Sequence, residues 1–403
     1  MRNRYFWKNE KISLRIIEER DAEVLYEILC DTTLRMQAEG GIALPATREM
    51  AEDMALYGIE MTNEGKAYWF AVLDNKKRMV GYAVIGCIDE RNGNAQCDVT
   101  ILPQYRRRGY GRAVYDILLR YAFYERRLHK VNCFVVEGND EAKAFLSALG
   151  FRIEAYRPEM FFSHKKYFGQ YYYGILKEEF ERGGLKKCVA NHIPENDLGK
   201  IEGDMPDFGS LFEDRYNFWD WNGILIRDMT EDDYYFNREM LFDSLEMRYY
   251  DNDVKLPIIN EKLTEREEEY IHFGGDGNRI EFAVTDSEGK YQGNINLHSI
   301  DRKNGTFSVS LYFLKNARNK GYAVKSMALL VKYAFEELRL NKMNICVNAG
   351  NESSARVMRK LGCSVEGVWR ENVYYDGKYV DVVLFGVTKK TFFERFEEKK
   401  YKK

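Results

Sequence analysis

The sequence repeats itself once, and this repeat constrains the fold more than any other feature. Arg106-Arg-Arg-Gly-Tyr-Gly111 aligns with Arg318-Asn-Lys-Gly-Tyr-Ala323 at an offset of 321 − 109 = 212 residues, and the offset then holds without a gap. Of the 46 aligned pairs, 17 are identical, which is far more than unrelated sequences give. A period of this length indicates two duplicated domains, because solenoid repeats are only about 20 to 50 residues long.

Composition agrees with two packed domains and excludes several classes of protein. Single cores tend to split above roughly 250 to 300 residues, and this chain has 403, of which 45% are hydrophobic. The net charge is 61 − 64 = −3, so no global positive field favours nucleic acid as a partner. The seven cysteines are scattered without a Cys-x-x-Cys pair and the five histidines show no ligand spacing, so we expect reduced thiols and no metal site. The first residues lack a signal peptide and no apolar run is long enough to span a bilayer, so we expect a soluble cytoplasmic protein without membrane partners.

Both copies predict the same order of elements. Apolar runs separated by polar turns predict a meander of strands, and apolar residues at helical spacing follow each glycine loop. In the first copy we expect strands at 67–72, 79–88, 97–102 and 131–136, with helices at 113–122 and 142–149. In the second we expect strands at 280–285, 292–299, 306–314 and 343–348, with helices at 327–335 and 354–361. An Asp-Gly turn predicts a hairpin at 374–379, matched by 161–173 in the first copy.

The domain bounds follow from these elements. We expect an N-terminal domain at 1–178, a linker with one short helix at 179–220, and a C-terminal domain at 221–403. The linker range mixes charges, glycines and prolines with little apolar periodicity.

The glycine loops have the features of an anion site. A loop that runs from a strand into a helix presents unpaired backbone N–H groups at the positive end of the helix dipole. Gly109 and Gly111 lack a Cβ, so the backbone can turn sharply and approach phosphate oxygens. Neither loop has the spacing of a nucleotide-hydrolysing P-loop or of a dinucleotide-binding fold.

Both segments resemble the signature of the GNAT acetyltransferase superfamily, [QR]-x-x-G-x-[GA], followed by Asn and then by Leu-Gly. The first copy has Asn139 and Leu149-Gly150, and the second has Asn351 and Leu361-Gly362. The second copy also resembles the RimJ/RimL-type branch, which acetylates protein N-termini and related amines, through Gly293-x-Ile-x-Leu297 and its Asp-Gly hairpin. The resemblance implies an α/β fold of two tandem domains, each with a mixed, mostly antiparallel sheet flanked by helices, in which the fourth and fifth strands splay apart.

The same resemblance implies that acetyl-CoA is the acyl donor and that its pantetheine arm lies along the fourth strand. The two asparagines would contact the cofactor, although an asparagine at a strand end also commonly caps the next helix. The residues assigned to acetyl-CoA are Thr100, Ile101, Leu102, Arg106, Arg107, Arg108, Gly109, Tyr110, Gly111, Arg112 and Asn139 in the first copy, and Phe313, Leu314, Arg318, Asn319, Lys320, Gly321, Tyr322, Ala323 and Asn351 in the second.

The catalytic groups stay unassigned at this level. Many family members place a tyrosine on the last helix as the thiolate's acid, but Leu146 and Met358 occupy that place here. Candidate bases are the carboxylates Asp98, Glu137, Glu281 and Asp301. We therefore expect an N-acetyltransferase acting on a primary amine, either a small molecule or a peptide N-terminus. Two alternatives remain: a two-domain transferase resembling mycothiol synthase or the peptide-bridge aminoacyltransferases, and a module that binds acyl-CoA without turnover.

Overall fold

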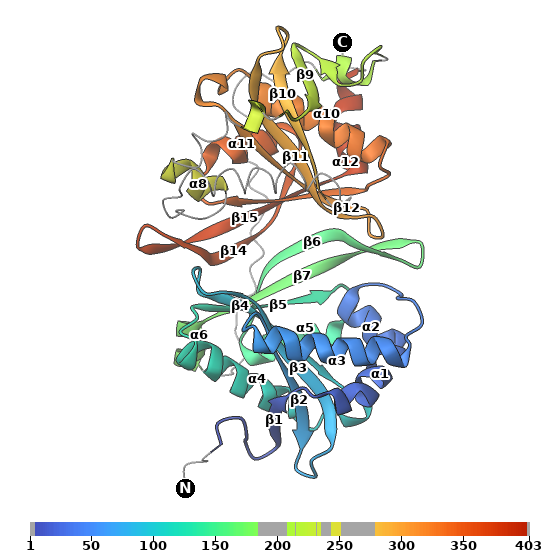
Figure 1. The fold of residues 1–403 in the computed structure, drawn as a ribbon, viewed down its shortest axis with the longest axis vertical. Coiled ribbons are helices and arrows are strands. Elements are labelled where there is room, and N and C mark those ends of the chain that lie inside the picture. Colours follow the sequence, from blue (N-terminus) through green and yellow to red (C-terminus); the bar gives the residue numbers. More distant parts are fainter. Residues whose placement is uncertain are drawn as a thin grey trace. The chain divides into compact units, whose positions relative to one another are not determined.

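The computed structural model describes residues 5–183, 208–213, 215–230, 232–234, 243–250 and 279–400. The chain divides into two compact units. One contains Met1–Ile193 together with Trp369–Tyr374, and the other contains Pro194–Val368 together with Tyr375–Lys403. Each unit is described by itself (Figure 1).

The sheet of the first unit has the order β1-β2-β3-β4-β5-β7-β6. Its neighbouring strands pair antiparallel except β4 and β5, which pair parallel. The strands are β1 (Ile12–Ile16), β2 (Tyr68–Asp74), β3 (Met79–Asp89), β4 (Asn94–Ile101), β5 (Lys130–Val136), β6 (Arg152–Ser163) and β7 (Lys166–Leu176). This is the mixed, mostly antiparallel sheet that the sequence predicts.

Helices cover both faces of this sheet. They are α1 (Ala22–Cys30), α2 (Thr32–Glu39), α3 (Arg48–Asn63), α4 (Tyr110–Arg120), α5 (Asp140–Leu149) and α6 (Lys177–Gly183). Val114 and Leu118 of α4 and Leu146 of α5 pack on alternate strand residues such as Ala83 and Cys97. On the other face, α1 and α3 pack on the remaining alternate residues, and α3 crosses in front of the strands in Figure 1. Period-two alternation in the strands therefore separates a face that contacts α4 from a face that contacts α1 and α3.

The second unit repeats this arrangement. Its strands follow the order β8-β9-β10-β11-β12-β13-β15-β14, and β12 and β13 form the parallel pair. They are β8 (Asp220–Trp221), β9 (Ile224–Asp228), β10 (Arg279–Asp286), β11 (Tyr291–Asp301), β12 (Thr306–Phe313), β13 (Lys342–Asn348), β14 (Ser364–Tyr375) and β15 (Lys378–Thr388). The helices are α8 (Ser244–Tyr250), α10 (Tyr322–Glu336), α11 (Glu352–Lys360) and α12 (Lys389–Lys400). The predicted fold class of two tandem domains is confirmed.

The β14–β15 and β6–β7 hairpins have different residues at their turns. Asp376 and Gly377, between β14 and β15, both have positive φ angles, as a type I′ turn requires. Between β6 and β7 the turn is His164-Lys165, with φ angles of +49° and +62° and no glycine. The strands before and after this turn are correspondingly harder to delimit from sequence.

The described parts of the range expected as linker pack onto the domains. Phe180 of α6 is buried in the core of the first unit. Phe208 and Leu211, at a short 3-10 turn (Gly209–Phe212), are buried in the core of the second. Residues 184–207 lie outside the described residues.

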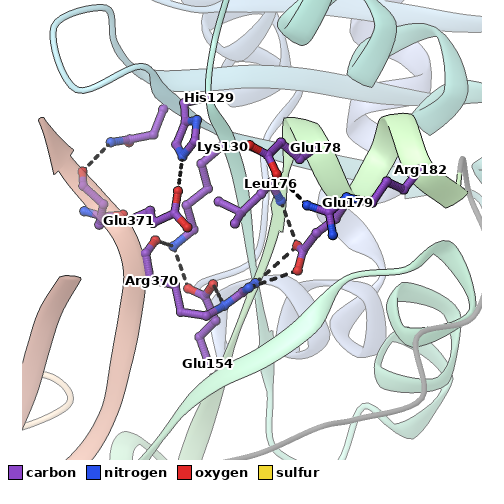
Figure 2. Close-up of polar contacts among 11 residues, drawn as sticks. His129, Lys130, Glu154, Leu176, Glu178, Glu179, Arg182, Arg370 and Glu371 are labelled. Carbon is purple, nitrogen blue, oxygen red and sulfur yellow. Dashed lines mark hydrogen bonds and ion pairs between the residues drawn. The ribbon is translucent and has the colours of Figure 1, made fainter. Parts of the chain in front are cut away.

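A buried ion pair occurs at the same place in both copies. Lys130 Nζ lies 2.6 Å from Glu154 Oε2, and Lys342 Nζ lies 2.7 Å from Glu366 Oε1. All four side chains are buried, and both partners are offset by 212 residues between the copies. Figure 2 shows the first pair.

Glycines make room for these carboxylates. An added Cβ at Gly174 would lie 2.6 Å from Glu154 Oε1, and one at Gly386 would come closer still to Glu366 Oε1. The pair and its glycine therefore form one packing unit that the duplication preserved.

We expect Lys342→Met to lower the free energy of unfolding by about 3–5 kcal/mol, because it leaves Glu366 as a buried charge without its cation. The double variant Lys342→Met/Glu366→Gln removes both charges, so its loss should be smaller than that of the single variant. Urea denaturation of the variants measures the difference. A double variant that is less stable than Lys342→Met would contradict this account of the pair.

Candidate functional site

Each sheet opens between its two parallel strands. β4 and β5 pair only from Asn94–Lys130 to Gln96–Asn132, although β4 continues to Ile101. β12 and β13 pair only at Thr306–Lys342 and Phe307–Met343, although β12 continues to Phe313. The expected splay of the fourth and fifth strands is therefore present in both domains.

The start of the opening is filled differently in the two domains. In the first, the Cys97 carbonyl accepts hydrogen bonds from the Tyr115 hydroxyl at 3.3 Å and from the Cys133 thiol at 3.1 Å. Burial raises the pKa of Cys97, Cys133 and Tyr115, so both thiols stay protonated and are poor nucleophiles. In the second domain Val309, Ile345 and Met327 occupy the equivalent positions.

Both glycine loops have the same backbone conformation. Arg107 and Asn319 have φ angles of +60° and +61°, and Gly109 and Gly321 have +79° and +82°. α4 and α10 begin directly after these glycines, with no side chain capping either N-terminus. The first N–H groups of each helix, which have no intrahelical acceptor, are therefore left for an anion such as pyrophosphate.

The difference between Gly111 and Ala323 has a packing reason. A Cβ at Gly111 would lie 3.0 Å from the ring of Phe145. The residue equivalent to Phe145 in the second copy is the smaller Val357, so that domain has room for the methyl group of Ala323.

One arginine of each loop holds the loop to its strand. Arg106 Nε donates to the Ile101 carbonyl, and Arg318 Nε donates to the Phe313 carbonyl, each at 3.1 Å. Arg318 also forms a bidentate pair with Glu246 of α8, at 2.7 and 2.8 Å. These guanidinium groups fix the position where each strand enters its loop.

The other predicted cations are distributed along the loops. Arg107 pairs with Glu141 at 3.0 Å, and Arg108 donates to the Gln104 carbonyl at 3.0 Å. Tyr110 and Tyr322 are the first residues of α4 and α10, and Arg112 and Lys320 lie beside the glycines in sequence.

Two lysines at the loops were not found by sequence reasoning. Lys11 Nζ donates to the Arg108 carbonyl at 3.2 Å, and Lys325 Nζ donates to the Asn222 carbonyl at 2.7 Å. An added Cβ at Gly109 would lie 2.6 Å from Lys11 Nζ, whereas one at Gly321 would lie 3.7 Å from Lys325 Cε. Lys11 precedes its loop by almost a hundred residues, and no local sequence pattern connects the two.

Asn139 and Asn351 cap the helices that follow them. The Oδ1 atom of Asn139 accepts from the Ala142 N–H at 3.2 Å, and that of Asn351 accepts from the Ser354 N–H at 3.1 Å. The capping interpretation is therefore confirmed for both residues.

The strand ends assigned to the cofactor arm lie along the openings. Thr100 and Ile101 end β4 beyond its last pairing with β5, and Phe313 ends β12. Leu102 is buried against Ile28 of α1 and Leu34 of α2. Leu314 contacts Met247 of α8 and Tyr312.

The candidate bases differ strongly in their surroundings. Asp301 accepts from the backbone and side chain of Asn304 in a hairpin turn, and Glu137 accepts from the Gly169 N–H. Glu281 accepts from Asn294. Asp98 lies on β4 just past the last β4–β5 pair and accepts from Gln96 Nε2 at 2.8 Å, and burial raises the pKa of its carboxyl.

Asp98 points away from α4, because its neighbour Cys97 packs in the core on that side. The positions expected for the tyrosine lie on α5 and α11, where Leu146 and Met358 are buried instead. Within the described residues, no group of three or more His, Cys, Asp or Glu side chains could hold a metal ion, and no helix is long and apolar enough to cross a membrane.

The chain belongs to the GNAT acetyltransferase family. The model of the acetyltransferase (GNAT) domain matches it twice, at residues 11–152 and 224–364, which together make up more than half of the sequence. It is an acyltransferase that uses acetyl-CoA as the acyl donor, and its two domains stand in tandem.

Several characterised and uncharacterised acetyltransferases are similar to parts of the chain. The prophage-derived uncharacterized N-acetyltransferase YokL of Bacillus subtilis is 28% identical over 43% of this chain and 95% of its own length. The putative ribosomal N-acetyltransferase YdaF of Bacillus subtilis is 34% identical over 26% of this chain. The matched part covers only 56% of that relative's length. Spermidine N(1)-acetyltransferase of Escherichia coli K12 is 23% identical over 40% of this chain and 84% of its own length.

Proposed function

We propose that each domain is a complete catalytic unit that transfers the acetyl group of acetyl-CoA to a primary amine of a small molecule or a peptide N-terminus. One observation carries this proposal. Both copies combine an opening between parallel strands with a loop whose glycine, in the left-handed region, leads directly into a helix N-terminus.

In this proposal the cofactor spans the loop and the opening. The pyrophosphate binds the first N–H groups of α4 or α10, with Lys11 beside the first loop and Lys325 beside the second. The pantetheine arm follows the unpaired edge of β4 or β12, where an added strand would find hydrogen-bonding partners. Asn139 and Asn351 use Oδ1 as helix caps, so contact with the arm falls to their Nδ2 groups.

Asp98 is the general base of the first domain in this proposal. The arm enters from the loop, so its reactive end reaches the start of the opening, where Asp98 lies. A partly desolvated carboxylate with a raised pKa, such as Asp98, is a stronger base than a fully exposed one, because its protonated form is favoured. Proton removal matters less for an α-amino group, with a reference pKa of about 7.7 to 8.0, than for lysine at about 10.4.

We also propose the finer assignments of family branch and domain bounds. The second domain is RimJ/RimL-like in this proposal, supported by its Gly293-x-Ile-x-Leu297 strand and its Asp-Gly hairpin. The domains extend over 1–178 and 221–403, with 179–220 as linker whose two ends pack onto the neighbouring cores.

The test is an amine panel with two readouts. Full-length protein is mixed with acetyl-CoA and with polyamines, amino acid amides, short peptides or lysine, and both thiol release and acetylated product are measured. We expect both to appear with at least one primary amine. Saturable binding of acetyl-CoA without thiol release from any amine would instead identify a binding module.

A further inference from the structure

The two domains differ on the sheet face opposite their central helix. In β11, Ile295 and Leu297 pack in the core below α10, so Asn294, Asn296 and His298 point to the other face. The equivalent residues of the first domain are Tyr82, Val84 and Gly86. The second domain therefore has a polar row where the first has an apolar one.

Asn294 and Asn296 of this polar row are buried, and His298 is half-buried. Asn296 has no exposed surface, and in the described part of the chain neither atom of its side-chain amide has a hydrogen-bond partner. An unsatisfied buried amide costs about 1–3 kcal/mol, so a hydrogen-bonding partner at Asn296 would stabilise this face.

His298 is held by two hydroxyl groups. Its Nε2 lies 2.8 Å from Ser310 Oγ and its Nδ1 lies 3.1 Å from Ser299 Oγ. Ser299 has a φ angle of +51° and lies where the register of β11 with β12 shifts, so a β-bulge sets the direction of this part of the strand.

Ser310 occupies the position that Asp98 has in the first domain, since 98 + 212 = 310. It lies on β12 three residues past the last β12–β13 pair and points away from α10, as its neighbour Val309 packs in the core. It is therefore at the start of the opening, where the proposed cofactor arm ends.

We propose that Ser310 and His298 together take the proton of the acceptor amine in the second domain, in place of the carboxylate of Asp98. The inference rests on the proposed function of that domain. In the required tautomer, Nδ1–H donates to Ser299 Oγ, and Nε2 accepts from the Ser310 hydroxyl.

The amine nitrogen attacks the thioester carbonyl carbon, so that a C–N bond forms and the C–S bond breaks with its electron pair on sulfur. The surplus proton on nitrogen passes to Ser310 Oγ as the serine's own proton passes to His298 Nε2. The imidazolium then returns this proton, through solvent, to the CoA thiolate, and the products are the acetamide and CoA thiol.

The surroundings suit a neutral imidazole. In the described residues, Arg279 on β10 and Ser308 on β12 lie opposite His298, and its ring contacts Ser299 and Ser310. Glu281, two residues further along β10, faces Asn296 and accepts from Asn294. Burial and Arg279 lower the pKa of His298, so the ring is neutral and able to accept a proton at neutral pH.

The test uses full-length protein in which Lys11→Met, Gly109→Asp and Asp98→Asn together silence the first domain. In this background we expect His298→Gln to lower kcat about 100- to 1,000-fold, within the range of general-base catalysis. It should also remove the fall in rate that the background shows below its His298 pKa. Glutamine can still bond to Ser310, and calorimetry should show unchanged acetyl-CoA binding. The control His129→Gln makes the same chemical change in the first unit and should leave the rate unchanged.

Adding Ser310→Asp to the His298→Gln variant should raise its rate at least tenfold. The fall in rate should then occur at lower pH. A rate within threefold of the background for His298→Gln would overturn the inference. So would a loss of rate with an unaltered pH profile, which indicates a structural role. A background that binds acetyl-CoA but releases no CoA with any amine would overturn the proposed function of this domain, and the inference with it.

Discussion

Replacing Gly321 by aspartate should weaken acetyl-CoA binding in the second domain about 100-fold or more while the fold persists. The new carboxylate stands where the pyrophosphate must bind, and the loss of one or two hydrogen bonds to a charged group, together with like-charge repulsion, is of this size. The backbone tolerates the change, because an added Cβ there meets only Lys325 Cε at 3.7 Å. Aspartate and asparagine also adopt the left-handed conformation more readily than other residues do. Gly321→Asn is therefore the matched control, with the same shape and no charge, and should bind more tightly than Gly321→Asp.

The equivalent change in the first domain should have a smaller effect. At Gly109 the new side chain meets the Lys11 ammonium, which can move and partly neutralise the aspartate. Removing that cation with Lys11→Met should therefore make Gly109→Asp as damaging as Gly321→Asp.

The two substitutions should act almost independently. The loops belong to separate compact units, and the effects of changes at distant sites without shared partners usually add. CoA release by wild type, Gly109→Asp, Gly321→Asp and the double variant measures this, with circular dichroism as the check on folding. If one single variant loses all activity and the other loses none, one domain is catalytic and its twin is not.

Asp98→Asn should lower the turnover of the first domain about 100- to 10,000-fold, the range for loss of a general base. Asparagine keeps an oxygen to accept from Gln96, so the local structure should survive. The assay uses a Gly321→Asp background, in which the first domain supplies the activity. With Asp98 present, the rate should fall as pH drops through its raised pKa, because the protonated carboxyl cannot accept a proton. Equal rates with and without the Asp98→Asn substitution across the pH range would contradict this role.

The same substitution should not reduce stability at neutral pH. Because the pKa of Asp98 is raised in the folded protein, folding favours the protonated form. This stabilisation is fully present below the unfolded pKa and is lost as pH rises through the folded pKa. At pH 7 the wild-type protein therefore carries a partly desolvated charge that the asparagine variant lacks. Thermal denaturation at pH 7 should give the variant an equal or higher Tm.

Much of the fold was predictable because it depends on local signals. Glycines in the left-handed region mark both loops, and an asparagine caps the helix after the next strand in each copy. A single glycine loop does not identify a fold. The repeat does, since the same local signals recur in the same order of strands and helices.

The features of the candidate site that were not predictable depend on contacts between residues far apart in the sequence, which no local pattern encodes. Lys11 reaches the loop at Arg108, and Tyr115 reaches the Cys97 carbonyl across the opening. The capping role of Asn139 was predictable, whereas the environment that distinguishes Asp98 from Asp301 was not. Both are carboxylates in strand segments, and only the structure shows Asp98 half-buried at the opening and Asp301 bonded within a turn.

The central claim is that one chain contains two acetyl-CoA sites, and counting bound cofactor tests it most directly. Native mass spectrometry of the full-length protein, titrated with acetyl-CoA to saturation, should show two molecules per chain. Gly321→Asp, and Gly109→Asp combined with Lys11→Met, should each reduce the count to one at a concentration that saturates the remaining site. Saturation of the wild-type protein at a single acetyl-CoA per chain would contradict the account.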